Sequence, residues 1–86
     1  MGSMTVGDAI RTTREKGGSK FNTHHASIKI GEVVDSLGET RHMPIDTHEE
    51  RIAATTALKG FYASGLIPMG VSFLNALIAT IGELRD

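Results

Sequence analysis

Apolar side chains recur at helical spacing from the start of this chain. Val6 and Ile10 stand four residues apart, which places them on one face of a helix. Thr5 precedes Asp8 by three residues, the spacing at which each side chain can bond the other residue's backbone at a helix start. The pattern predicts a first helix from about Val6 to Lys16, ended by the two glycines that follow it.

A second apolar face follows a polar stretch. Its members fall at i, i+3, i+4 and i+7, and they are Ile30, Val33, Val34 and Leu37. This spacing lines one side of a helix, and Gly38 stands where a left-handed cap would end it. Residues 26–30 also alternate in the manner of a strand, so a short strand is the alternative there. We rank the helix above the strand.

The clearest helix start comes after a connector at residues 40–46. Pro44 keeps the preceding Met43 out of helical backbone angles. Thr47 and Glu50 then form a capping-box pattern, in which each side chain bonds the other residue's backbone N–H. The third helix is therefore predicted to begin at residue 47 or 48.

The last apolar segment predicts a fourth helix from Val71 to Leu84. Gly65 suits the end of the third helix, and Pro68 suits the first turn of the fourth. Apolar positions cover more than half of the fourth helix, namely Val71, Phe73, Leu74, Leu77, Ile78, Ile81 and Leu84. A narrow stripe of small residues completes it, namely Ser72, Asn75, Ala76, Ala79 and Gly82. A helix so widely apolar needs partners on several sides.

These segments predict an all-α fold. Short N-terminal helices precede an antiparallel helical hairpin over residues 47–85, within one small domain at residues 4–86; residues 1–3 look like the remnant of an expression tag. A chain of this size with no cysteine and few aromatic rings has little to fill a core, so we expect a homo-oligomer. The expected interface consists of Leu58, Phe61, Phe73, Leu74, Leu77, Ile78 and Ile81.

Residues 60–82 could be a membrane-spanning segment by length and lack of charge. They contain no charged side chain and are long enough to cross a bilayer. Pro68, a turn signature and several polar residues interrupt them, which makes the segment less apolar than a spanning helix needs to be. We do not expect a membrane partner.

The net charge of −1 conceals two unequal parts. Residues 1–30 carry five Lys and Arg against two Asp and Glu, whereas residues 31–86 carry four against eight. A basic front can attract an anionic partner or the acidic part of another copy. The net charge of only −1 excludes a strongly basic protein that coats nucleic acid by charge alone.

A polar and basic segment at residues 17–27 is predicted to be a flexible loop. With its neighbours it offers candidate ligands for an anion, namely Arg11, Arg14, Lys20, His24, His25 and Lys29. Its sequence Gly17-Gly18-Ser19-Lys20 lacks the preceding strand and the spaced glycines of a nucleotide-binding phosphate loop.

No motif in the sequence points to catalysis. The histidines lack the spacing typical of metal ligands, there is no cysteine, and no serine stands in a nucleophile turn. We therefore expect no metal, no cofactor and no enzyme activity, and the absence of cysteine and of a secretory signal favours the cytoplasm.

The remaining function class is binding. The first hypothesis is a small regulatory protein whose basic front binds a nucleotide or another phosphate-bearing molecule. The alternative is a protein-binding adaptor or inhibitor, of the compact kind that phages and mobile elements encode, acting through the acidic and apolar C-terminal hairpin. A DNA-binding regulator comes third, because the chain lacks the spacing of a helix-turn-helix unit.

Overall fold

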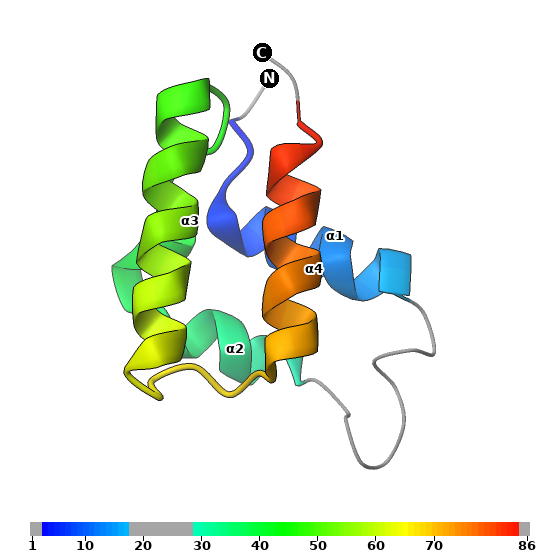
Figure 1. The fold of residues 1–86 in the computed structure, drawn as a ribbon, viewed down its shortest axis with the longest axis vertical. Helices are drawn as coiled ribbons and strands as arrows, with labels where there is room; N and C mark the ends of the chain where they lie inside the picture. Colours follow the sequence, from blue (N-terminus) through cyan, green and yellow to red (C-terminus); the bar gives the residue numbers. More distant parts are fainter. Residues whose placement is uncertain (1–2, 18–28, 85–86) are drawn as a thin grey trace.

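The computed structural model describes residues 3–17 and 29–84, and these residues form an all-α fold, as predicted (Figure 1). The helices are α1 (Val6–Gly17), α2 (Ile30–Ser36), the 3-10 helix η2 (Gly38–His42), α3 (His48–Ala63) and α4 (Val71–Gly82). Lys29 has extended backbone angles and Ile30 is already helical, while residues 26–28 of the alternative strand lie outside the described residues. The predicted loop at residues 17–27 also lies almost wholly outside them.

Two helices begin on the reciprocal caps that the sequence predicts. The N–H of Thr5 donates to Asp8 Oδ2 at 3.0 Å, and the N–H of Asp8 donates to Thr5 Oγ1 at 3.3 Å. At α3 the N–H of Glu50 donates to Thr47 Oγ1 at 3.1 Å, and the N–H of Thr47 donates to Glu50 Oε1 at 2.9 Å. Because these bonds satisfy N–H groups that have no partner inside a helix, both helix starts are fixed locally.

A glycine closes the C-terminal end of α3, as predicted. Gly65 has a φ of +70°, and Leu66 donates its N–H to the carbonyl of Phe61 at 3.1 Å. The N–H of Gly65 donates to the carbonyl of Tyr62 at 3.0 Å, which completes a Schellman motif. The sequence predicts Pro68 in the first turn of the next helix, but α4 begins only at Val71, after an extended Gly70.

The connector at residues 40–46 is more ordered than the sequence indicates. Its first residues belong to η2, and Met43 then leaves helical angles as predicted. The carbonyl of Met43 accepts the N–H of Val6 at 2.9 Å, and the N–H of Ile45 donates to the carbonyl of Met4 at 3.0 Å. This antiparallel contact fastens the residues before α1 to those before α3.

Helix α4 lies between α1 and α3 and packs against both (Figure 1). It runs beside α3 in the opposite direction, while α2 and η2 pack against α1. Five side chains of α4 are buried, whereas the longer α3 buries only Ala54 and Leu58. Much of α3 therefore remains at the surface.

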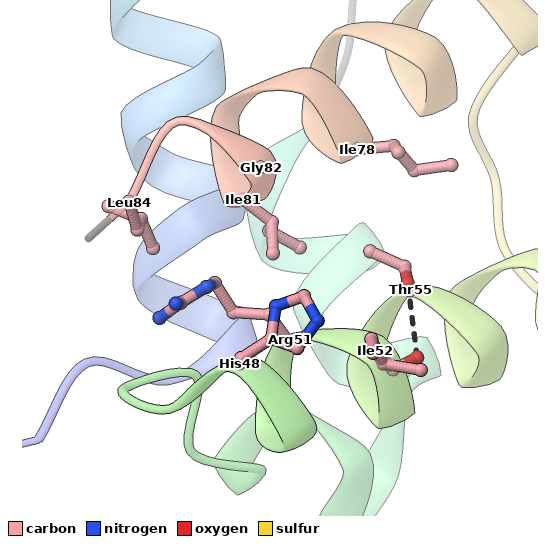
Figure 2. A pocket seen from close by; sticks show the side chains of 8 residues that line it. All are labelled: His48, Arg51, Ile52, Thr55, Ile78, Ile81, Gly82 and Leu84. Atoms are coloured by element: carbon pink, nitrogen blue, oxygen red, sulfur yellow. Dashed lines mark hydrogen bonds between the residues drawn. The ribbon is translucent and has the colours of Figure 1, made fainter. Parts of the chain in front are cut away.

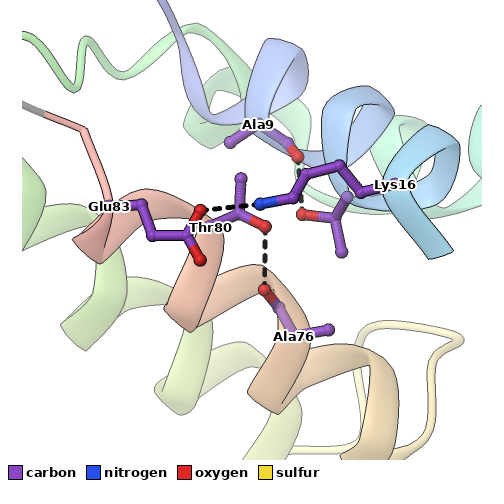
Figure 3. A network of polar contacts seen from close by, with 6 residues as sticks. Ala9, Lys16, Ala76, Thr80 and Glu83 are labelled. Carbon is purple, nitrogen blue, oxygen red and sulfur yellow. Dashed lines mark hydrogen bonds and ion pairs between the residues drawn. The ribbon is translucent and has the colours of Figure 1, made fainter.

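Two buried threonines and one ion pair lie where α1 packs against the C-terminal part of the chain around α4 (Figure 3). Thr13 Oγ1 donates to the carbonyl of Ala9 at 2.8 Å, and Thr80 Oγ1 donates to the carbonyl of Ala76 at 2.9 Å. Each hydroxyl is thus satisfied by its own helix, so the two helices can pack closely without an unpaired polar group. At the end of this contact Lys16 Nζ lies 2.7 Å from Glu83 Oε2 (Figure 3).

Most side chains of the expected interface between copies lie inside the core of a single chain. Five of its seven residues are buried in the core of a single chain and have almost no surface to offer a second copy: Leu58, Phe73, Leu74, Leu77 and Ile81. Within one chain α1 and α3 both pack against α4, and the interface over these seven residues stays a prediction. Phe61 and Ile78 are only partly buried, and the homo-oligomer itself stays a prediction.

Among the described residues, no helix combines the length and the apolar character that a membrane span requires.

Candidate functional site

A groove of about 600 Å³ opens between the first half of α3 and the end of α4 (Figure 2). Its lining comes from two helices and the residues just after α4, namely His48, Arg51, Ile52, Thr55, Ile78, Ile81, Gly82 and Leu84. We refer to this feature as the α3/α4 groove. Its volume falls within the range of protein ligand sites, and its floor is mostly apolar.

The α3 wall of the groove is one helical stripe. Residues 48, 51, 52 and 55 stand at i, i+3, i+4 and i+7, so they share a face. The capping box at Thr47 fixes where this helix begins and therefore which face meets α4. Ile52 is 52% exposed on this stripe, and the Thr55 hydroxyl donates to the carbonyl of Ile52 at 3.0 Å (Figure 2). The wall consequently presents apolar surface to the solvent.

The α4 wall is uncharged. Ile81 is fully buried beneath the groove, while Ile78 and Leu84 are partly exposed beside it. Gly82 carries no side chain, which keeps this end of the groove open.

Arg51 is held in place at the rim. Its Nη1 donates to the carbonyl of Asp46 at 2.8 Å and to that of Ile45 at 3.2 Å. These bonds tie the residues before α3 to its first turn, so Arg51 has a structural role in addition to its place beside the groove.

A second, polar cavity of about 370 Å³ lies where α1, the end of α2 and η2 meet. Its lining includes three basic side chains, Arg11, Arg41 and His42, and two acidic ones, Asp8 and Asp35. The carboxylate of Asp8 caps α1 and lies 4.0 Å from the guanidinium of Arg11. Arg41 Nη1 donates to the carbonyl of Gly38 at 2.7 Å. We refer to this feature as the polar cavity.

The structure describes three of the six residues that are predicted to bind an anion. Arg11 lines the polar cavity, while Arg14 and Lys29 do not. Lys29 is exposed at the start of α2, and Lys20, His24 and His25 lie outside the described residues. The anion site over these six residues stays a prediction.

Within residues 3–17 and 29–84, no three His, Asp or Glu side chains lie close enough together to hold a metal ion.

Sequence reasoning missed most of the α3/α4 groove. The i, i+3, i+4, i+7 spacing from His48 to Thr55 is present in the sequence, but nothing local distinguishes Ile52 from the other apolar positions of a helix face. Ile78 and Ile81 are predicted to meet another copy, whereas in the structure they line or underlie the groove.

The comparisons with known proteins place the chain in no family. No protein-family model matches the sequence, and neither curated proteins nor solved structures give a match. The two cavities themselves are therefore the basis for proposing a function.

Proposed function

We propose that this chain is a non-catalytic protein-binding module that holds an amphipathic helix of a partner in the α3/α4 groove. The observation that carries the proposal is the exposed apolar surface of Ile52, at the rim of a groove floored by Ile81 and flanked by Ile78. Covering such surface is favourable by about 25 cal/mol per Å² of apolar area.

A helix is the occupant that suits the shape of the groove. Two neighbouring helices that run in opposite directions leave a furrow between them, and a third helix can pack its ridge of side chains into that furrow. Partners that bind in this way present apolar residues at i, i+3 or i+4, and i+7. The proposal follows the adaptor or inhibitor hypothesis rather than the anion-binding one.

The first test uses a displayed library of helical peptides with an apolar i, i+3, i+4, i+7 stripe and random residues elsewhere. We expect the enriched peptides to bind Ile52→Glu at least about tenfold more weakly than the unaltered chain, because a carboxylate at the rim would be buried against the apolar stripe of the bound peptide. Affinities are measured by fluorescence anisotropy with the synthetic peptides.

Leu66→Glu is the matched control. Leu66 is 62% exposed and lies after α3, away from the α3/α4 groove. The control should bind the peptides with an affinity within about twofold of the unaltered chain. Failure to enrich any peptide, or an equal loss in both variants, would contradict the proposed function.

The polar cavity supports a second candidate function, binding of a phosphate-bearing molecule. It brings Arg11 together with Arg41 and His42 from η2, although these residues are 30 or more positions apart in sequence. Guanidinium groups recognise phosphate oxygens through paired, charge-assisted hydrogen bonds.

A pair of charge-matched variants tests this second function. Arg11→Gln should weaken binding of inorganic phosphate and of a nucleoside monophosphate by about tenfold, because a charge-assisted bond is lost. Arg14→Gln removes the same charge one turn along α1, outside the polar cavity, and should have little effect. Equal effects in NMR titrations would show that only the overall charge matters, and this function would be withdrawn.

A further inference from the structure

We infer that the outward surface of α3 pairs with the same surface of a second copy, with the two helices antiparallel. The proposed function concerns the α3/α4 groove. This inference concerns the neighbouring surface of the same helix and goes beyond that function. It depends on which side chains α3 leaves exposed and on where its charges stand.

The outward surface of α3 is a stripe of exposed residues that recur at i, i+3, i+4 and i+7, and we call it the outer face. Its members are Glu49, Ile52, Ala53, Thr56, Lys59, Gly60 and Ala63. Figure 1 shows α3 at one side of the molecule, and α4 is the helix against which α3 packs most extensively. The outer face therefore points away from the rest of the described chain.

The outer face has few charges for a helix surface that meets solvent. Such a surface is normally charged or polar, but here Ile52 is 52% exposed and most of its neighbours on the outer face are small. A Cβ added at Gly60 would meet no atom within 4 Å outside its local backbone. Small side chains on an open surface allow a second helix to approach to about 8 Å between the helix axes.

Glu49 and Lys59 are the two charged residues of the outer face. Neither side chain has a hydrogen bond or an ion pair within residues 3–17 and 29–84. Ten residues separate them, which corresponds to about 15 Å along the helix axis, so they are too far apart to pair within one chain. Each charge is therefore available to a group on another molecule.

A second copy supplies the opposite charges at the required places. If two α3 helices lie antiparallel about a two-fold axis at position 54, Glu49 of each copy faces Lys59 of the other, because both stand five residues from that axis. Ile52 of one copy then lies beside Thr56 of the other and loses exposed apolar surface. A parallel pairing would instead place each charge against its own copy, which opposes association.

The outer face and the α3/α4 groove meet at Ile52, which belongs to both. A helix held in the groove and a second copy on the outer face would therefore compete for this side chain. Glu49 and Lys59 do not line the groove. Variants at these two positions consequently test the pairing of two copies without altering the groove.

The experiment uses two charge reversals, Glu49→Lys and Lys59→Glu, and measures self-association by sedimentation equilibrium. Each variant alone would bring two pairs of like charges into the antiparallel contact. We expect each to self-associate at least about tenfold more weakly than the unaltered chain. An equimolar mixture restores both ion pairs, because the new lysine of one variant faces the new glutamate of the other. The mixture should therefore dimerise with an affinity within about threefold of the unaltered chain.

Lys29→Glu is the matched control. It makes the same charge change at an exposed position at the start of α2, outside the outer face, and should leave self-association unchanged. Glu49 stands in the first turn of α3, where a lysine interacts unfavourably with the helix dipole. Circular dichroism therefore checks that each variant keeps its helices, and dimerisation of the mixture shows the same independently.

The outcomes separate this inference from the proposed function. One helix pair buries less than a standard interface, so the expected dimer is weak and depends on concentration. A chain that stays monomeric up to about 1 mM would overturn the inference. The same conclusion would follow from an unchanged affinity in both charge variants, or from a mixture that dimerises no more tightly than either variant alone. Both charge variants should still bind the peptides selected on the groove, so loss of self-association leaves the helix-binding function standing.

Discussion

Replacing Leu58 by alanine is expected to lower the free energy of unfolding by about 2–5 kcal/mol. Leu58 is fully buried, and Ala54 is the only other residue of α3 that is buried to this degree. Phe61 and Tyr62 of α3 pack against the core only in part, so Leu58 is the largest fully buried anchor of this helix. The loss is measured by urea denaturation followed by far-ultraviolet circular dichroism.

Ile52→Ala on the same helix is the control for this prediction. It removes an aliphatic side chain that is 52% exposed, so the free energy of unfolding should change by only about 0.5 kcal/mol or less. The two substitutions also distinguish effects on stability from effects on peptide binding, because Ile52 lines the α3/α4 groove and Leu58 does not. Similar losses of stability in both variants would show that α3 is attached through a different face.

Local signals in the sequence are enough to predict the helices. The caps at Thr5 and Thr47, and the glycine at the end of α3, act within a few residues of themselves. Such interactions do not depend on the remainder of the fold. The all-α class could be predicted for this reason.

The contacts between distant segments could not be predicted in the same way. Pairing of Thr5 with Pro44 and packing of α1 on α4 join residues 39 to about 70 positions apart. Periodicity shows that α4 has apolar residues on several sides, but it does not say which element covers each side. The expected interface between copies arose from that ambiguity.

The candidate site combines both kinds of information. The helical spacing from His48 to Thr55 can be recognised in the sequence. The position of this stripe beside Ile78 depends on how α3 and α4 pack. The pairing of Glu83 with Lys16, 67 residues apart, is still less accessible from the sequence.

Two glycines of one segment are expected to respond to alanine with opposite signs. Gly65→Ala should destabilise the fold by about 1–2 kcal/mol, because a φ of +70° brings the new Cβ too close to the backbone. Gly60→Ala should stabilise it by about 1 kcal/mol, because Gly60 lies inside α3, where alanine is the better helix former.

Crowding does not complicate this comparison. A Cβ added at either position would meet no atom within 4 Å outside its own local backbone, so the backbone preference decides both signs. The measurement is the shift of the urea midpoint at an unchanged slope, which reports stability rather than compactness. A stabilising Gly65→Ala would mean that residues 61–66 do not form the Schellman motif in solution. The position of Leu66 against Phe61, which closes α3 and directs the chain toward α4, would then need another explanation.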